Sequence, residues 1–367
     1  MFRLIYFSPV AWASYAQRPH FFVRYLLDHG VVSEVLWVDP YATRLPRWDD
    51  LARPRAPARR EERSPAEVRR LTVSALPVEP LPGGWTLNRY FVSRRALREL
   101  SAFAREGPCG IGVGRPSAVA AWALQSLPHR VSFFDAMDDF PAFYGPLSGG
   151  AMARRERVIA RMVDWVFCSS HALVRKFDRL AGRVRLVPNG YPMGSLPEPA
   201  PAGSRADIGY VGSIARWFDW PLVAEIARAL PAVTIRLIGP EFVARPRALP
   251  ANVTVLPECP REEAVAHVRE FAVGLIPFGL SRLTASVDPI KYYEYMALGV
   301  PVWSTPFGEM AWRGGEHGVR LVERGVDWPS LYREAIATAI DRGAVSLFRR
   351  QNDWAARLGV VAECLAS

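Results

Sequence analysis

Residues 288–305 hold side chains whose types and spacing suit a nucleotide diphosphate. The segment predicts a loop, a short helix that Pro289 begins and Gly299 ends, and a buried strand. Its sequence is Asp-Pro-Ile-Lys-Tyr-Tyr-Glu-Tyr-Met-Ala-Leu-Gly-Val-Pro-Val-Trp-Ser-Thr. Lys291 would add a cation to the first helical turn, where the helix dipole already attracts phosphate. Glu294, one turn on, would suit a pair of ribose hydroxyls. The alternative is an ordinary surface helix.

The same segment resembles the nucleotide-sugar-binding motif of GT-B glycosyltransferases of the retaining family-four type, in a subgroup of bacterial polysaccharide biosynthesis. That motif has a Pro, a Lys, a Glu-Tyr pair and then Ala-x-Gly-x-Pro-Val. The matching positions are Pro289, Lys291, Glu294, Tyr295, Ala297, Gly299, Pro301 and Val302. The resemblance implies that Glu294 holds the ribose of a nucleotide sugar, that Lys291 holds its diphosphate, and that Tyr292 belongs to the same site.

A second donor segment is expected at residues 208–216, which predict a strand that ends in a glycine turn. At such a turn Gly212 and Ser213 would let backbone N–H groups approach a phosphate, and Arg216 follows within reach. The alternative for Gly212 is an ordinary turn at the end of a strand.

The loop before residue 288 departs from the family pattern. Many members have a Glu eight residues before the ribose-binding Glu, and Ser286 stands at that position here. Because that Glu is tied to retaining chemistry, the stereochemical outcome stays open. The loop still resembles a subgroup in which Thr284 and Asp288 line the donor pocket.

Three carboxylates, Asp135, Asp138 and Asp139, follow a predicted strand over Val131–Phe134. Ligands of parallel sheets bind at the carboxyl ends of the strands, so these side chains are candidates for the acceptor side. An inverting enzyme would use Asp138 or Asp139 as general base, and a retaining enzyme could use it to hold an acceptor hydroxyl. The alternative is that one of them caps the turn at Phe140–Tyr144.

Arg18 and His20 are further acceptor-side candidates, because Gln17-Arg-Pro-His20 follows the first predicted strand and opens a helix. The alternative is a plain helix start at the surface. No metal or cofactor is expected: GT-B enzymes by resemblance need no metal, and the four scattered cysteines form no C-x-x-C pair. The glycines of residues 110–116 do not have the G-x-G-x-x-G spacing of a dinucleotide site.

Short apolar runs alternate with helical patterns along the whole chain, which predicts an α/β protein with doubly wound parallel sheets. A segment rich in Pro, Gly and Ala, Pro192–Ser204, separates two series of such runs and reads as a linker. The resemblance implies two Rossmann-like domains that face a cleft, with the last helix returning to the first domain. The expected domains are an acceptor-binding domain over 1–198 plus 350–367, and a nucleotide-sugar-binding domain over 199–349. The expected strands are Leu4–Phe7, Val35–Val38, Leu71–Ser74, Gly110–Val113, Val131–Phe134, Trp165–Cys168, Val184–Val187, Ile208–Val211, Thr234–Ile238, Val253–Leu256, Val273–Ile276, Val300–Ser304 and Val319–Val322.

The chain has 367 residues and a net charge of +10, which allows three kinds of anionic partner. Nucleic acid is not expected, because no nucleic-acid-binding motif is visible. An anionic membrane surface suits a transferase whose acceptors are lipid-linked, and the Arg-rich residues 44–82 and the basic helix around residues 154–162 are candidates for it. The alternative is that the charge serves solubility alone. Scattered cysteines and no apolar run of membrane-spanning length favour the cytoplasm, with peripheral attachment to the inner membrane face.

The residues together predict a metal-independent glycosyltransferase that moves a sugar, of hexose type, from a nucleotide-diphosphate donor to a saccharide or lipid-linked acceptor. A GT-B nucleotide-sugar epimerase would share the donor site but need no acceptor. A non-enzymatic protein that binds membranes or polyanions is the third hypothesis, and only the charge favours it.

Overall fold

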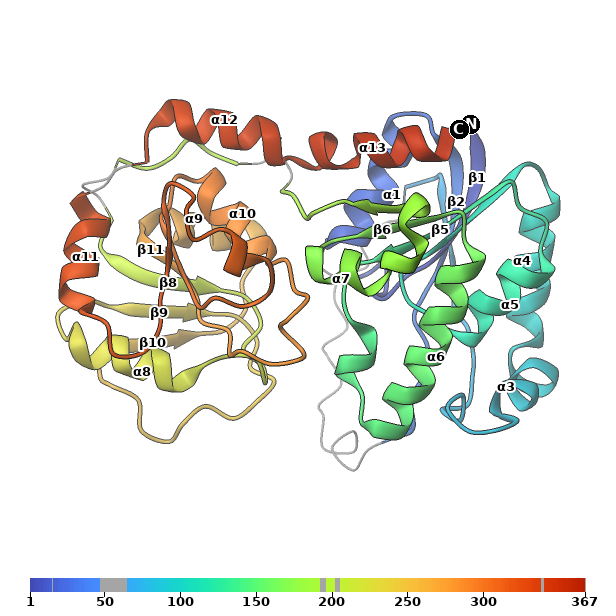
Figure 1. The fold of residues 1–367 in the computed structure, drawn as a ribbon, viewed down its shortest axis with the longest axis horizontal. Helices are drawn as coiled ribbons and strands as arrows, with labels where there is room; N and C mark the ends of the chain where they lie inside the picture. The colour runs from blue at the N-terminus through green and yellow to red at the C-terminus, as the bar shows by residue number, and fades with distance from the viewer. Residues whose placement is uncertain (15, 47–64, 192–195, 202–204, 338–339, 367) are drawn as a thin grey trace. The chain divides into compact units, whose positions relative to one another are not determined.

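The computed structural model describes residues 1–14, 16–46, 65–191, 196–201, 205–337 and 340–366. The chain forms two compact units, each built around one parallel sheet (Figure 1). The first unit comprises Met1–Val187 together with Leu358–Ser367, and the second comprises Pro188–Arg357.

The sheet of the first unit has the strand order β3-β2-β1-β4-β5-β6-β7, and every neighbouring pair is parallel. The chain order changes direction between β1 and β4, so the sheet is doubly wound. The strands are β1 (Phe2–Phe7), β2 (Val32–Val38), β3 (Val68–Leu71), β4 (Cys109–Val113), β5 (Val131–Ala136), β6 (Trp165–Cys168) and β7 (Val184–Leu186). The helices are α1 (Arg18–Asp28), α3 (Gly84–Leu87), η1 (Asn88–Val92), α4 (Arg94–Arg105), α5 (Ala118–Ser126), η2 (Phe140–Phe143), α6 (Pro146–Met162), α7 (His171–Lys176) and η3 (Asp178–Arg183).

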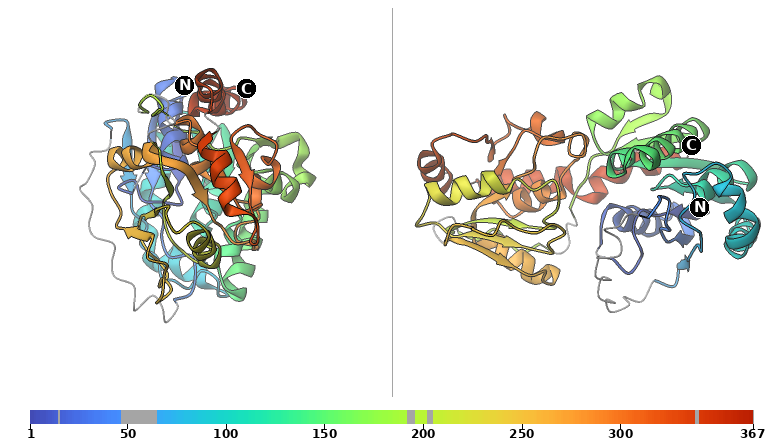
Figure 2. Two further views of the ribbon diagram at one scale, coloured as in Figure 1. Left: turned by 90° about the vertical axis from the view of Figure 1, so that its left-hand side faces the viewer. Right: turned by 90° about the horizontal axis from the view of Figure 1, so that it is seen from below.

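Both faces of this sheet are buried, which explains why its strands read as continuous apolar runs (Figure 2). Ile5 and Phe7 of β1 belong to the core that α4, α5 and α6 complete. Tyr6 points to the opposite face, where its ring lies near Phe22 of α1 and Phe133 of β5. With both faces covered, the strand ends are where polar side chains of this sheet can meet a ligand.

The second unit repeats the plan with the strand order β10-β9-β8-β11-β12-β13, again all parallel, and its switch point lies between β8 and β11. The strands are β8 (Asp207–Val211), β9 (Ile235–Ile238), β10 (Val253–Leu256), β11 (Phe271–Ile276), β12 (Val302–Ser304) and β13 (Val319–Leu321). The helices are α8 (Trp220–Ala229), α9 (Arg261–Glu270), α10 (Ile290–Ala297), η6 (Gly308–Trp312), α11 (Trp328–Ala337), α12 (Arg342–Asn352) and α13 (Trp354–Ala366), the last of which continues into the first unit.

The predicted strands coincide with observed ones, apart from shifts of one to three residues at their ends and one larger error. The prediction of a strand over Leu71–Ser74 is wrong, because β3 ends at Leu71. Pairing explains the difference: β2 ends at Val38, whose partner is Leu71, so the edge strand has no neighbour beyond that point. Val73 is buried without belonging to the sheet.

The chain enters and leaves the second unit through two segments that pair with each other. The Tyr191 N–H donates to the Asn352 carbonyl at 3.2 Å, and the Trp354 N–H donates to the Tyr191 carbonyl at 3.1 Å. From Leu358 onward α13 belongs to the first unit, which confirms the expected return of the last helix. The first unit ends at Val187, and the expected linker Pro192–Ser204 lies largely outside the described residues.

The expected Arg-rich segment over residues 44–82 also lies partly outside the described residues, since these resume at residue 65. Across the ranges described above, none of the helices combines the length and the apolar content that crossing a bilayer requires. The expected basic helix is α6, whose Ile159 and Ala160 are buried while Arg154 and Arg157 are exposed.

Two glycine substitutions in the first unit should change the free energy of unfolding in opposite directions. A Cβ added at Gly112 would lie 2.4 Å from the Phe133 ring and 2.8 Å from the Tyr6 ring, so Gly112→Ala should destabilise by about 1–3 kcal/mol. A Cβ at Gly150, within α6, would meet nothing within 4 Å, so Gly150→Ala should stabilise by about 0.4–1 kcal/mol. Urea unfolding of both variants measures this, and two shifts of the same sign would contradict the packing described for Gly112.

Candidate functional site

The first turn of α10 lies directly against the turn that follows β8. Pro289 occupies the N-cap of α10, and Gly299, at φ +65°, ends it, as the sequence predicts. A Cβ at Gly212 would lie 2.2 Å from Cε and 2.5 Å from Nζ of Lys291, so the end of this lysine side chain lies directly against the glycine. The Nζ atom also lies 5.3 Å from the centre of the Tyr210 ring. The sequence-predicted Gly212 and Lys291 are therefore neighbours.

The Gly212 turn is held in a conformation that other residues rarely adopt. Gly212 has φ +146°, and its N–H donates to the Ile238 carbonyl at 2.8 Å. Gly239, with φ +142°, lets the chain pass so closely that a Cβ there would lie 2.2 Å from the Gly212 carbonyl oxygen. The Tyr210 hydroxyl donates to the Ser213 carbonyl at 2.7 Å. These contacts fix the backbone at a carboxyl strand end, where anions bind in such sheets.

The ammonium group of Lys291 is buried. Burial lowers the pKa of its ammonium group, and Glu294 one turn away partly opposes that shift. Arg261, the first residue of α9, forms an ion pair with Glu294 at 3.3 Å. Arg216 is exposed and forms no hydrogen bond or ion pair with any residue in the described ranges. Two cations, Lys291 and Arg261, thus lie near the Glu294 carboxylate.

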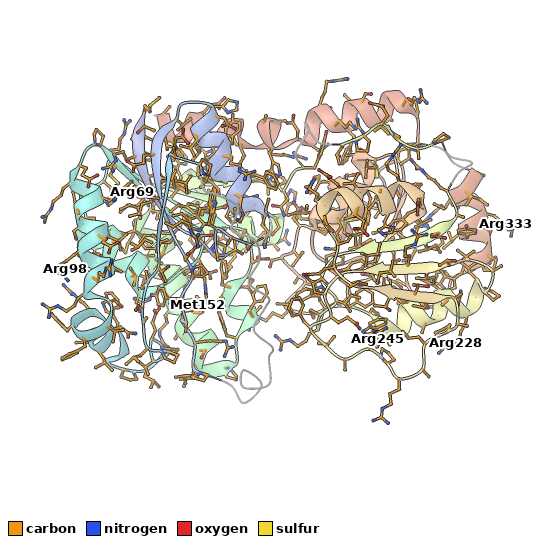
Figure 3. The ribbon with its side chains drawn as sticks, turned by 180° about the vertical axis from the view of Figure 1, so that it is seen from behind. Arg69, Arg98, Met152, Arg228, Arg245 and Arg333 are labelled. Atoms are coloured by element: carbon orange, nitrogen blue, oxygen red, sulfur yellow. The ribbon has the colours of Figure 1, made fainter. Side chains whose placement is uncertain are left out.

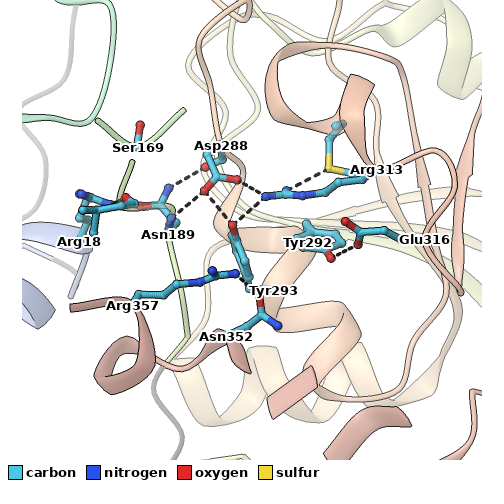
Figure 4. A network of polar contacts seen from close by, with 12 residues as sticks. Arg18, Ser169, Asn189, Asp288, Tyr292, Tyr293, Arg313, Glu316, Asn352 and Arg357 are labelled. Carbon is cyan, nitrogen blue, oxygen red and sulfur yellow. Dashed lines mark hydrogen bonds and ion pairs between the residues drawn. The ribbon is translucent and has the colours of Figure 1, made fainter. Parts of the chain in front are cut away.

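Tyr292 turns away from this group. Its hydroxyl donates to Glu316, and its ring lies under the Arg313 guanidinium, whose carbon is 3.9 Å from the ring centre (Figure 4). The Tyr292 side chain therefore packs against Arg313 and Glu316, whereas the Lys291 side chain packs against the Gly212 turn.

Asp288 is the centre of a buried network (Figure 4). Its carboxylate accepts from Arg313 at 2.7 Å, from the Tyr293 hydroxyl at 2.9 Å and from the Asn189 N–H at 2.7 Å. The Asn189 amide donates in turn to the Asp288 carbonyl at 2.7 Å. Because these donors occupy its carboxylate, Asp288 fixes the entry to α10.

Thr284 has a similar structural setting. It is buried, and its hydroxyl donates to the Gly279 carbonyl at 2.7 Å, which closes the loop after β11. Arg313, which the sequence analysis missed, anchors Asp288 from a segment without a recognisable motif. In the sequence, Arg313 stands out only as a basic residue next to Trp312. Such a pair of neighbours is too common to indicate a site.

In the first unit, Arg18 and Asp135 form an ion pair inside the core. The side chain of Asp135 is fully buried, and its carboxylate accepts from the Arg18 guanidinium at 2.9 Å and from the Tyr6 hydroxyl at 3.3 Å. Arg18 also donates to the Val187 carbonyl at 2.7 Å. The pair joins the start of α1 to the ends of β5 and β7.

His20 closes the start of α1. Its Nδ1 accepts from the Gln17 N–H at 3.1 Å, so Nε2 carries the proton and donates to the Trp12 carbonyl at 3.1 Å. The ring is buried between Trp12 and Trp37. The helix-start alternative therefore describes His20 well, although the helix start is buried rather than at the surface.

Asp139 lies at the N-cap position of η2, but its side chain makes no capping hydrogen bond, so the capping alternative is not supported for it. Lys176 of α7 donates to the Asp139 carboxylate at 2.6 Å and forms a second ion pair with the buried Glu156 of α6. Sequence reasoning missed Lys176, although it and Lys291 are the only lysines in a chain rich in arginine.

Asp138 differs from its neighbours. It is half-buried, and its carboxylate has no hydrogen bond or ion pair with the described residues. Burial raises its pKa to about 7, Asp135 and Asp139 push in the same direction, and Arg18 opposes them. A carboxyl group in that state can accept a proton near neutral pH.

No three His, Cys, Asp or Glu side chains in the described ranges are grouped so that they could hold a metal ion. The expectation of a metal-independent reaction stays a prediction.

Comparison with known proteins bears on the fold of the chain. No family model matches the chain. The chain is 30% identical over 168 residues to TuaH of Bacillus subtilis (strain 168), which is named as a provisional teichuronic acid biosynthesis glycosyltransferase. The match covers 41% of this chain and 42% of TuaH, so the chain spans less than half the length of this curated relative.

Solved structures match over the whole chain. Anabaena HepE, solved in complex with UDP, has a TM-score of 0.66 at 15% identity and full coverage of both chains. The chain has the GT-B fold. Sucrose-phosphate synthase from Thermosynechococcus elongatus has a TM-score of 0.62 at 17% identity, with 98% of each chain covered. The lipopolysaccharide outer core galactosyltransferase WaaB has a TM-score of 0.62 at 10% identity, with 100% of this chain and 99% of WaaB covered. The predicted architecture is confirmed.

The core ion pair of the first unit should matter for stability. Asp135→Asn leaves the Arg18 guanidinium buried without its counter-charge, which should lower the free energy of unfolding by about 3–5 kcal/mol. Urea unfolding at pH 8 measures this.

Asp138→Asn is the matched control. It removes a carboxylate whose raised pKa makes its ionised form costly in the folded state, so it should leave stability at pH 8 unchanged or higher. That gain should shrink as the pH falls through about 7 and should vanish near about pH 3, where Asp138 is protonated in both states. Equal losses from the two substitutions would contradict the separate settings of these residues.

Proposed function

We propose that the chain is a glycosyltransferase that moves a sugar from a nucleotide-diphosphate donor to a saccharide or lipid-linked acceptor in bacterial polysaccharide or glycoconjugate biosynthesis. The observation that carries the proposal is the contact between Lys291, at the N-terminus of α10, and the Gly212 turn after β8. It brings a cation, a helix dipole and a glycine backbone to one strand end, and all three stabilise a diphosphate.

The comparisons support this choice of chemistry. TuaH is named for teichuronic acid biosynthesis, WaaB for the lipopolysaccharide outer core, and HepE was solved with UDP and with UDP and glucose. The epimerase and the non-enzymatic hypotheses find no support among these proteins.

In the proposed donor site, the backbone N–H of Ser213, with Lys291 and Arg216, holds the diphosphate. Gly212, whose own N–H is engaged by the Ile238 carbonyl, lets the phosphate approach the backbone closely. The role of these groups in the reaction is to stabilise the negative charge that develops on the diphosphate as the bond to the sugar breaks. Glu294 accepts hydrogen bonds from the ribose hydroxyls. The ion pair with Arg261 orients Glu294 for that task. No step in this account calls for a metal ion.

In the proposed acceptor site, Asp138 receives the acceptor's proton or holds its hydroxyl, depending on the stereochemical course. Its pKa of about 7 suits a group that must be ionised to accept a proton and neutral afterwards. Asp139 is committed to Lys176 and acts as a positioning residue beside it. The proposed place of work is the cytoplasmic face of the membrane, where lipid-linked acceptors are assembled.

Nucleotide binding tests the donor site. Lys291→Met should weaken the affinity for UDP at least about tenfold, because it removes a charge-assisted contact to phosphate. Glu294→Ala should weaken UDP binding but leave the affinity for inorganic pyrophosphate unchanged, because only the ribose is affected. Isothermal titration calorimetry measures each.

Lys176→Met, at the other lysine, should leave the UDP affinity of the wild type in place. Full UDP affinity in both donor-site variants would refute the assignment of this site.

The pH dependence of transfer tests Asp138. Turnover should rise with pH through about 7, as Asp138 loses its proton, and Asp138→Asn should remove that limb and lower turnover about 10²–10⁴-fold. The charged groups around Asp138 are Arg18, Asp135 and Asp139 with its partner Lys176. Glu156, whose pKa burial also raises to about 7, titrates in the same range.

Lys176→Met separates these groups. It removes the cation that balances Asp139, so the limb should move to higher pH, whereas Lys176→Arg should leave it in place. A limb that persists in Asp138→Asn would assign it to another group, with Glu156→Gln as the next variant to measure.

A further inference from the structure

Residues 76–98 of the first unit carry a group of exposed apolar side chains, which we call the aromatic turn. Phe91 is 77% exposed and Tyr90 is 55% exposed, both within the π-helical turn η1. Leu76, Leu81 and Leu87 are also exposed. Apolar residues this large are seldom left in water together without a partner, so the cluster indicates an interaction surface.

The exposure of these side chains does not come from a loose segment. The buried Asn88 accepts from the Leu76 N–H at 2.8 Å and donates to the Leu76 carbonyl at 3.0 Å. The Ser93 hydroxyl donates to the Ser74 carbonyl at 2.8 Å. A Cβ at Gly84 would lie 2.0 Å from the Val78 carbonyl oxygen, so the segment folds tightly on itself. The polar interior of the turn is satisfied, and its apolar side chains are held outward.

Glu79 ties the segment to the rest of the unit. Its carboxylate accepts from the Tyr41 hydroxyl at 2.7 Å and from the Ala118 N–H, at the start of α5, at 2.8 Å. Glu79 is the acidic residue within residues 76–98, and its carboxylate is engaged inside the fold. The exposed face of the segment therefore carries no negative charge from Glu79.

The charge beside the aromatic turn has one dominant sign. Arg89, Arg94, Arg95 and Arg98 are exposed around it, and Figure 3 shows Arg98 on the outer side of α4. Arg95 forms a surface ion pair with Glu99 at 2.9 Å. Guanidinium groups that flank exposed aromatic and leucine side chains match an anionic headgroup layer above an apolar interior.

The aromatic turn and the acceptor-side carboxylate Asp138 follow strands of the same parallel sheet. The segment follows the carboxyl end of β3, and Asp138 follows the carboxyl end of β5 in the same parallel sheet. The carboxyl ends of β3 and β5 themselves are four strand spacings apart, which is roughly 19 Å. A bilayer at the aromatic turn would lie along the edge that carries the acceptor-side carboxylate.

We propose that the aromatic turn, with the arginines beside it, docks the first unit onto an anionic lipid bilayer. Tyr90 and Phe91 insert at the level of the headgroups, and the four arginines contact lipid phosphates. The docking itself does not depend on the transferase activity. Only its purpose, access to a lipid-linked acceptor, rests on the proposed function.

Vesicle sedimentation tests the docking. The full chain should bind vesicles of phosphatidylglycerol and phosphatidylcholine, should bind less as salt rises, and should bind pure phosphatidylcholine weakly. Tyr90→Ser with Phe91→Ser, and separately Arg94→Glu with Arg98→Glu, should each lower the affinity for the anionic vesicles about tenfold or more.

The second unit supplies matched controls. Phe242→Ser removes an apolar side chain that is 69% exposed, and Arg228→Glu with Arg333→Glu makes the same change of charge at exposed positions (Figure 3). These variants should bind vesicles like the wild type. Equal losses in test and control variants, or no vesicle binding by the wild type, would overturn the proposal, and the second result would direct the search to a protein partner.

UDP affinity, measured on the same samples, separates this proposal from the proposed function. The aromatic-turn variants should keep the UDP affinity of the wild type. Loss of vesicle binding with full UDP binding supports the docking surface, whereas vesicle binding without any UDP affinity would leave the docking in place and refute the donor site.

Discussion

Burial on both faces of two parallel sheets is the constraint on which the chemistry of this protein depends. Helices cover each sheet, so side chains in the middle of a strand face protein on either side. Polar groups that must meet a substrate can then lie only where the strands end. The Gly212 turn follows β8, the Asp138 loop follows β5, and the aromatic turn follows β3. The Gly212 turn and the Asp138 loop therefore lie at carboxyl strand ends, and the aromatic turn lies on the connection that leaves β3.

The same constraint separates carboxylates that serve the fold from carboxylates left for chemistry. Asp135 and Asp288 are buried, and each has a guanidinium partner, Arg18 and Arg313 respectively. Removing either partner would strand a charge in a medium that solvates it poorly, so these pairs hold their segments firmly. Asp138 has no such partner among the described residues, and its half-buried carboxyl group has a raised pKa of about 7. A buried carboxylate that pairs with a guanidinium stabilises the fold, whereas a buried carboxyl group without such a partner can exchange its proton near neutral pH.

The sequence predicted the fold well, because strand–helix alternation and the glycine that ends α10 are local signals. It also brought Gly212 and Lys291 into one site, since the motif fixes a helix start and the topology places it beside the switch point. It could not tell that Arg18, His20 and Asp135 lie in the core. A polar residue at a strand end reads the same whether its partner is a ligand or another residue far along the chain.

Lys176 shows why long-range pairing escapes a reading of the sequence. Lys176 comes 37 positions after Asp139, and no motif in the residues between them predicts that the two side chains are in contact. Once α6 and α7 pack on the sheet, one ammonium group lies between Asp139 and Glu156. An ammonium is a compact point charge that can contact two carboxylates at once, as the guanidinium groups of Arg3 and Arg236 also do elsewhere in the chain. In a chain whose other long basic side chains are all arginines, one lysine lies against the Gly212 turn and the other pairs with Asp139, next to Asp138 in the same loop.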